Sequence, residues 1–136
     1  MKKDLKENHG VNVDKYIYGG HSLGGSSMAS WVQGNAEDAM GTFLWGSYVG
    51  HSVEDPAKNY KSPVLTVGAE FDGWMARITR IAQSYDQMLS SSIGATQARY
   101  RYPVVLIEGL NHASFLSGIP PSKVQTTDLR ATISLK

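Results

Sequence analysis

One serine lies between glycines in the stretch Gly20-x-Ser22-x-Gly24, directly after the short apolar run 16–20. An apolar run that ends in glycines predicts a strand turning sharply into a helix. On such a turn, a nucleophile elbow, the serine has a strained backbone and the positions around it must be small. Gly20, Gly24 and Gly25 meet that requirement. The pattern predicts that Ser22 is a nucleophile, and the alternative is an ordinary serine in a glycine-rich loop.

Serine alone is a weak nucleophile, so a base and an orienting acid should accompany it. On an elbow of this kind the acid follows the serine along the chain, and the histidine follows the acid. Asp72 comes just past the apolar run 63–70, and His112 comes just past the run 103–109. Catalytic groups converge at the carboxyl ends of strands in an α/β sheet, so both residues are well placed. Asp72 has a turn or helix cap as its alternative role, and Glu70 is the rival acid, which we expect within the strand.

The other histidines have weaker claims to the role of base. His9 reads as part of a surface turn, and His21 as a residue that packs beside the serine. His51 lies in a polar loop before the acid, which is the wrong order for this arrangement. The four histidines show no metal-ligand spacing and the chain has no cysteine. We therefore predict no metal site, no cofactor, no disulfide and no thiolate nucleophile.

The elements that would position these residues alternate between strands and helices. Four apolar runs predict strands, at residues 16–20, 41–48, 63–70 and 103–109. Their continuous hydrophobicity is typical of strands buried on both faces of a parallel sheet. The segment 22–34 predicts a short helix, and a second helix should begin near Trp74 with one apolar face, made of Trp74, Ile78, Ile81, Tyr85 and Met88. We expect one α/β domain over residues 1–136, with a parallel sheet and flanking helices.

Composition excludes several classes of partner. The 136 residues include 13 Lys plus Arg and 12 Asp plus Glu, a net charge of +1, which provides no basic field for nucleic acid. No apolar run approaches the roughly 20 residues of a membrane span. The N-terminal stretch "MKKDLKENHG" lacks the apolar core of a signal peptide, and the sequence predicts no particular compartment.

The motifs "GGHSLGG", "PVLTVGAEFDG" and "VVLIEGLNHASF" together resemble the C-terminal half of an α/β-hydrolase, the superfamily of serine esterases, lipases and dienelactone hydrolases. The resemblance implies that Ser22 is the nucleophile, Asp72 the acid and His112 the general base. It also implies that the backbone N–H of Leu23 is one donor of the oxyanion hole. His21, Trp74 and Phe115 could line a substrate pocket or belong to the core.

The two ends of the chain look unfinished beside this family. The resemblance covers about residues 15–117 and four of the usual eight strands, so we expect a partial fold that lacks the N-terminal strands and the second oxyanion donor. The stretch "TTDLRATISLK" predicts the start of a C-terminal helix.

Two functions are compatible with the sequence. The first is a serine hydrolase that cleaves small carboxylic ester or thioester substrates through an acyl-enzyme. The loop "HSVEDPAKNYKS" is short and polar, which favours an esterase over a lipase with a lid. The second is an inactive α/β-hydrolase fragment that associates with the missing N-terminal half or with an oligomer partner.

Overall fold

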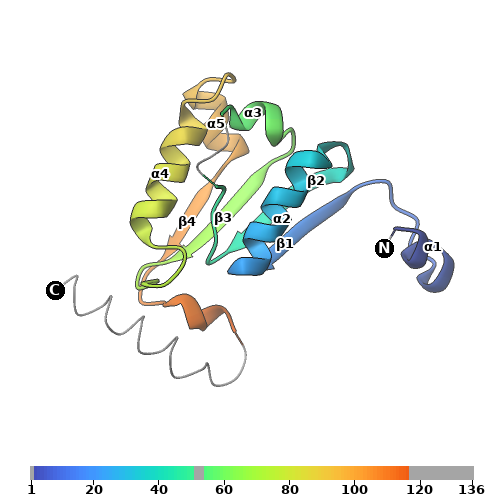
Figure 1. Ribbon diagram of the computed structural model, residues 1–136, viewed down its shortest axis with the longest axis horizontal. Helices are drawn as coiled ribbons and strands as arrows, with labels where there is room; N and C mark the ends of the chain where they lie inside the picture. Colours follow the sequence, from blue (N-terminus) through green and yellow to red (C-terminus); the bar gives the residue numbers. More distant parts are fainter. Residues whose placement is uncertain (1, 51–53, 117–136) are drawn as a thin grey trace.

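The computed structural model describes residues 2–50 and 54–116, and these form a sheet with flanking helices (Figure 1). The strands are β1 (Tyr16–His21), β2 (Ala39–Trp45), β3 (Val64–Ala69) and β4 (Val104–Ile107). The α-helices are α1 (Lys2–His9), α2 (Leu23–Gly34), α3 (Pro56–Asn59), α4 (Ile78–Leu89) and α5 (Ala95–Arg101). Two 3₁₀ helices, η1 (Ala36–Asp38) and η2 (His112–Phe115), complete the described elements.

The four strands are parallel and lie in the order β1-β2-β3-β4. Each of the predicted apolar runs contributes one strand, and helices connect the strands along the chain (Figure 1). The prediction of an α/β fold with a parallel sheet is therefore confirmed. The carboxyl ends of all four strands meet at one edge of the sheet, because parallel strands run in the same direction.

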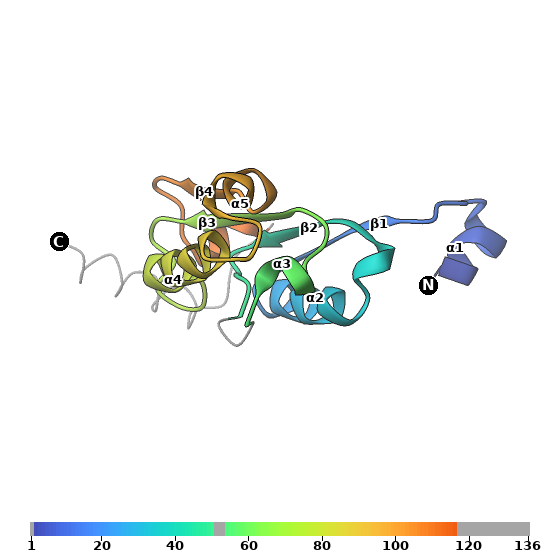
Figure 2. The ribbon, with the colours of Figure 1, turned by 90° about the horizontal axis from the view of Figure 1, so that it is seen from above.

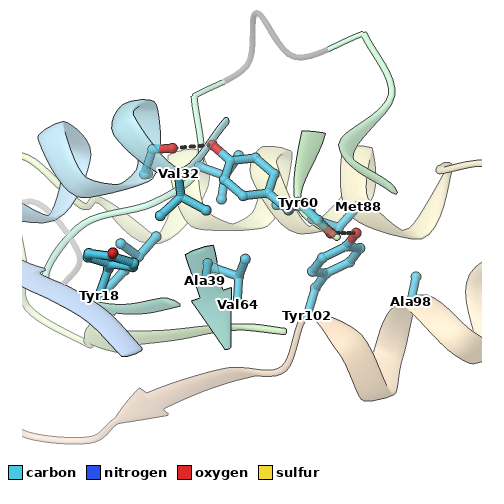
Figure 3. Packing of buried hydrophobic residues seen from close by; sticks show 11 residues of the cluster. Tyr18, Val32, Ala39, Tyr60, Val64, Met88, Ala98 and Tyr102 are labelled. Atoms are coloured by element: carbon cyan, nitrogen blue, oxygen red, sulfur yellow. Dashed lines mark hydrogen bonds between the residues drawn. The ribbon is translucent and has the colours of Figure 1, made fainter. Parts of the chain in front are cut away.

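Helices α2, α3 and α4 lie on the same side of the sheet (Figure 2). The core is packed between these helices and the sheet, and Tyr18, Val32, Leu44 and Val64 are among its buried residues. Figure 3 shows this core, in which Tyr60 and Tyr102 are also buried and the hydroxyl of Tyr102 donates to the carbonyl of Tyr60. The hydroxyl of Tyr60 donates to the carbonyl of Ala29 in α2, so it ties the segment before β3 to that helix.

The opposite face of the sheet is buried at β3, where it includes Val67 and Ala69, but it is exposed at β1 and β4, so the prediction of burial on both sides is confirmed only in part. The strand register places Ile17, Val105 and Ile107 on that face, and these side chains are 69%, 47% and 37% exposed. The cause is the placement of the helices: α2, α3 and α4 share one face in the part of the chain that the structure describes. Continuous hydrophobicity correctly predicted the parallel strands, but the described helices cover only one of their faces.

Helix α4 begins at Ile78, four residues after the predicted start near Trp74. The segment between them contains bends, and the non-helical backbone of Arg77, with φ −52° and ψ 143°, separates it from α4. The Asp72 carboxylate holds this segment by accepting hydrogen bonds from the backbone N–H groups of Trp74 and Met75. Helix α5 was not predicted. The predicted C-terminal helix and His51 lie outside the described residues.

Candidate active site

Ser22 occupies the sharp turn between β1 and α2. Its backbone has φ 56° and ψ −126°, and among the described residues it is the one non-glycine residue with positive φ. The backbone N–H of Ser22 donates to the carbonyl of Trp45 in β2, and its own carbonyl accepts from Ser26 in α2. These bonds fix a conformation that L-residues adopt only at a cost of about 1–3 kcal/mol. Strain of this kind, held by both flanking elements, is the property expected of a nucleophile elbow.

The glycines that this turn requires are Gly20 and Gly25. A Cβ added to Gly20 would lie 2.6 Å from the backbone carbon of Gly24, and one added to Gly25 would lie 2.7 Å from the carbonyl oxygen of Gly20. At Gly24 an added Cβ would meet nothing within 4 Å. Gly24, which we predicted as an elbow glycine, therefore has no steric need to be small. The close approach occurs one residue later, where the helix backbone faces β1.

The structure brings Ser22, His112 and Asp72 together in one hydrogen-bonded chain. The Nε2 atom of His112 lies 2.8 Å from Ser22 Oγ, and its Nδ1 atom lies 2.6 Å from Asp72 Oδ2. An ionised carboxylate only accepts hydrogen bonds, so Nδ1 carries the proton and Nε2 is left to accept one from the serine. His112 and Asp72 are 1% and 4% exposed, so this contact is shielded from water.

The Asp72 carboxylate is held through both of its oxygens. Oδ1 accepts from the backbone N–H groups of Trp74 and Met75 at 3.0 and 3.1 Å, and Oδ2 accepts from His112. A buried carboxylate needs such partners because desolvation is otherwise costly. The bond to His112 therefore has a defined direction, which orients the imidazole.

Glu70, the rival acid, is directed elsewhere. Strand β3 ends at Ala69, so Glu70 lies one residue past the strand and not within it as predicted. Its Oε2 accepts a hydrogen bond from the backbone N–H of Gly109 at 2.9 Å. Glu70 thus ties the loop after β4 to the end of β3, and Asp72 is the carboxylate that reaches His112.

His21 contacts His112 directly. Its Nε2 atom lies 3.0 Å from the backbone carbonyl oxygen of His112, and the two imidazole rings are 4.7 Å apart. Burial lowers the pKa of His21 below its ordinary value, and the charge of His112 acts in the same direction. The bond to the His112 carbonyl and the charge of Asp72 act to raise that pKa, but burial is the largest contribution.

Apolar side chains contact the two imidazoles and the serine. Trp74 is 46% exposed and meets the His112 ring edge-on at 5.2 Å, while Phe115 lies 5.7 Å from the ring of His21. The sequence did not point to Met75, whose sulfur lies 3.2 Å from Ser22 Oγ. Two signals could have suggested it: Met75 is three residues from Asp72, and methionine is common where a surface must adapt its shape.

A groove elsewhere on the molecule is unrelated to this constellation. It has a volume of about 400 Å³ and lies between α4 and β4, where Ile78, Ile81, Tyr85 and Leu106 are among its lining residues. None of the three residues of the hydrogen-bonded chain lines it.

Within residues 2–50 and 54–116, no three side chains of the His, Cys, Asp or Glu type are grouped as metal ligands. The described helices also include none with the length and apolar character needed to cross a membrane.

The comparison with protein families agrees with this geometry. The family model described as the alpha/beta hydrolase family matches residues 3–136. The chain belongs to the alpha/beta hydrolase family. Membership accounts for the parallel sheet and gives this chain a fold whose members are generally hydrolytic enzymes. A search among curated proteins finds no sequence that matches the chain.

Proposed function

We propose that this alpha/beta hydrolase is a serine hydrolase that cleaves carboxylic esters or thioesters through an acyl-enzyme. The observation that carries the proposal is the hydrogen-bonded chain from Ser22 Oγ through His112 to Asp72, at 2.8 and 2.6 Å. In this arrangement a serine becomes nucleophilic, because the histidine can take its proton as the attack begins. The strained backbone of Ser22 further supports the assignment of an elbow.

The reaction then follows from the positions of the three groups. Ser22 Oγ attacks the substrate carbonyl carbon while His112 Nε2 takes the hydroxyl proton. His112 returns that proton to the departing alcohol or thiol, and Ser22 is left acylated. Water then attacks the acyl carbon while His112 takes its proton, and His112 returns that proton to Ser22 Oγ as the acid is released. Asp72 accepts a hydrogen bond from Nδ1–H throughout, without taking the proton, and stabilises the imidazolium that forms twice in the cycle.

The backbone N–H of Leu23 is the proposed oxyanion donor. Leu23 is the first residue of α2, and the first N–H groups of a helix have no carbonyl partner within that helix. The N-terminus of the helix also favours negative charge through its dipole. This donor would stabilise the oxyanion that develops next to Ser22.

Covalent labelling provides the test. Wild-type protein is treated with a fluorophosphonate probe and assayed with p-nitrophenyl butyrate, beside Ser22→Ala and the control Ser27→Ala. The Ser27 hydroxyl is on the same helix, but it is exposed and donates to the carbonyl of Leu23. We expect labelling and turnover in the wild type and in Ser27→Ala, and neither above background in Ser22→Ala.

Circular dichroism and thermal unfolding ensure that all three proteins are folded. A folded wild type that shows no labelling dependent on Ser22 contradicts the proposed hydrolase activity. That result would favour a protein of this fold that acts by association.

A further inference from the structure

His21 connects the nucleophile and the base through the backbone. It ends β1 and directly precedes Ser22, yet its Nε2 reaches the carbonyl oxygen of His112, 91 residues later in the chain. A carbonyl oxygen cannot donate, so Nε2 carries the proton and donates it. The bonds from Ser22 and Asp72 reach the ring of His112, whereas the bond from His21 reaches its main chain.

His112 lies in a very short element, so the position of its backbone depends on contacts with the rest of the fold. η2 is a four-residue 3₁₀ helix, and the hydrogen bonds within it and its caps are local, among residues 111–116. A short helix of this kind has little rigidity of its own. A hydrogen-bond donor from β1, which is a strand of the sheet, ties the backbone of His112 to the rigid part of the fold.

Both imidazoles also pack against one glycine. Gly46 follows β2 with φ +49°, and a Cβ added there would lie 3.2 Å from Nδ1 of His112 and 3.3 Å from Nε2 of His21. The absence of a side chain at this position lets the two rings approach the same stretch of backbone. A displacement of His21 would therefore open space beside the ring of His112.

The charge state of His21 is compatible with this role. The titratable groups that act on it are His112 and Asp72, and burial is the largest cause of its lowered pKa. A neutral His21 donates its Nε2 proton without opposing the positive charge that His112 acquires during attack. Since that Nε2 is committed to the His112 carbonyl, His21 is not itself the base for Ser22.

We propose that His21 is a positioning residue, whose Nε2–H holds the backbone of His112 so that the imidazole stays aligned with Ser22. The inference rests on the proposed function of the site. Loss of the donor lets η2 shift relative to β1 and lengthens the contact between Nε2 and Oγ. A misplacement of about 1 Å at a reacting group can lower the rate about 100-fold.

Three substitutions separate donation from packing. In His21→Gln the side-chain amide nitrogen can occupy nearly the place of Nε2, so the donor is kept. In His21→Asn the amide is one atom shorter and falls short of the carbonyl, and His21→Phe keeps a ring without a donor. With p-nitrophenyl butyrate we expect kcat about 10- to 100-fold lower in the Asn and Phe variants and within about threefold of wild type in the Gln variant, with KM unchanged in all.

A spectroscopic measurement gives a second readout that needs no turnover. The Nδ1 proton of His112, in its short bond to Asp72, should give a low-field proton NMR resonance. We expect this resonance to be retained in His21→Gln and shifted or broadened in His21→Asn and His21→Phe. Thermal unfolding identifies which variants are folded. The test requires only that His21→Gln and one of the other two variants are folded.

Two results would overturn the inference. One is wild-type kcat and an unchanged resonance in the folded Asn or Phe variant. The other is a Gln variant as impaired as the Asn variant, which would mean that the imidazole acts by packing. If wild-type protein shows no activity that depends on Ser22, the proposed function fails, and the NMR comparison still decides whether His21 positions His112.

Discussion

At the scale of single residues, Asp72 is held at both carboxylate oxygens, which determines the effect of an amide in its place. In Asp72→Asn the amide oxygen can still accept from Trp74 and Met75, and the NH₂ group then faces Nδ1 of His112. Nδ1 must now accept a hydrogen bond, so the ring proton moves to Nε2. A protonated Nε2 cannot take the proton of Ser22. We expect kcat to fall by about four orders of magnitude with little change in KM.

Glu70→Gln is the matched control for that substitution. Glu70 is two residues away on the same loop, but its carboxylate accepts from Gly109 and does not reach His112. We expect kcat of the Gln variant to stay within about threefold of wild type, measured by steady-state hydrolysis of p-nitrophenyl butyrate. A large loss in Glu70→Gln, with a small one in Asp72→Asn, would reverse the assignment of the acid.

The residues of the hydrogen-bonded chain could be found from the sequence because each has a local signal. Ser22 lies between a strand and a helix with glycines around it, and Asp72 and His112 each follow an apolar run. Met75 and Gly46 have no such signal. Their importance arises from contacts across the fold, to Ser22 Oγ and to the two imidazoles, and these depend on tertiary packing.

At the scale of elements, the packing of α2 against the sheet depends on Gly25. In Gly25→Ala the new Cβ would lie 2.7 Å from the Gly20 carbonyl oxygen and 2.7 Å from Cβ of Ser47. Both neighbours are backbone or close to it, so α2 must move away from β1 and β2. We expect the free energy of unfolding to fall by about 1–3 kcal/mol, measured by urea denaturation, and kcat to fall because Ser22 begins that helix.

Gly24→Ala is the control, because the same substitution one residue earlier meets open space. Alanine loses less backbone entropy than glycine when a helix forms, so stability should rise, by up to about 1 kcal/mol. Equal destabilisation by the two alanines would mean that α2 does not approach the sheet as closely as these distances require.

The start of α4 illustrates what sequence periodicity leaves out. The apolar spacing from Trp74 onward fits a helix, but the backbone of Arg77 is non-helical, with φ −52° and ψ 143°, and α4 begins only at Ile78. The side chain of Arg77 donates to the carbonyl of Gly73, so a polar contact holds the turn before α4. A pattern of apolar residues contains no information about such a contact.

At the scale of the whole molecule, two tyrosines join the helical layer to the sheet. The hydroxyl of Tyr102 donates to the carbonyl of Tyr60, and the hydroxyl of Tyr60 donates to the carbonyl of Ala29 in α2 (Figure 3). The Tyr60 hydroxyl also accepts from the side chain of Gln33 in α2. Burial raises the pKa of both hydroxyls above the ordinary value of 10.0. This network links segments that precede β3 and β4 to α2. Ionisation of the two tyrosines should therefore lower the stability of the entire fold.

The sign of the alkaline effect follows from these raised values. In the unfolded chain the tyrosines ionise near pH 10, whereas in the folded protein they keep their protons to higher pH. Their contribution to stability is therefore complete below about pH 10 and is lost as pH rises through the folded pKa values. We expect the free energy of unfolding, measured by urea denaturation from pH 8 to pH 12, to decline steeply above pH 10, together with a cooperative rise in tyrosinate absorbance.

Two phenylalanine variants identify the groups responsible for this decline. Tyr60→Phe removes a buried hydroxyl, so it should lower stability at neutral pH by about 1–3 kcal/mol and reduce the loss of stability above pH 10. Tyr100→Phe alters a side chain that is 85% exposed and should change neither quantity. An alkaline decline equally steep in Tyr60→Phe and in the wild type would mean that Tyr60 does not contribute to it. The cause would then have to be sought outside this part of the core.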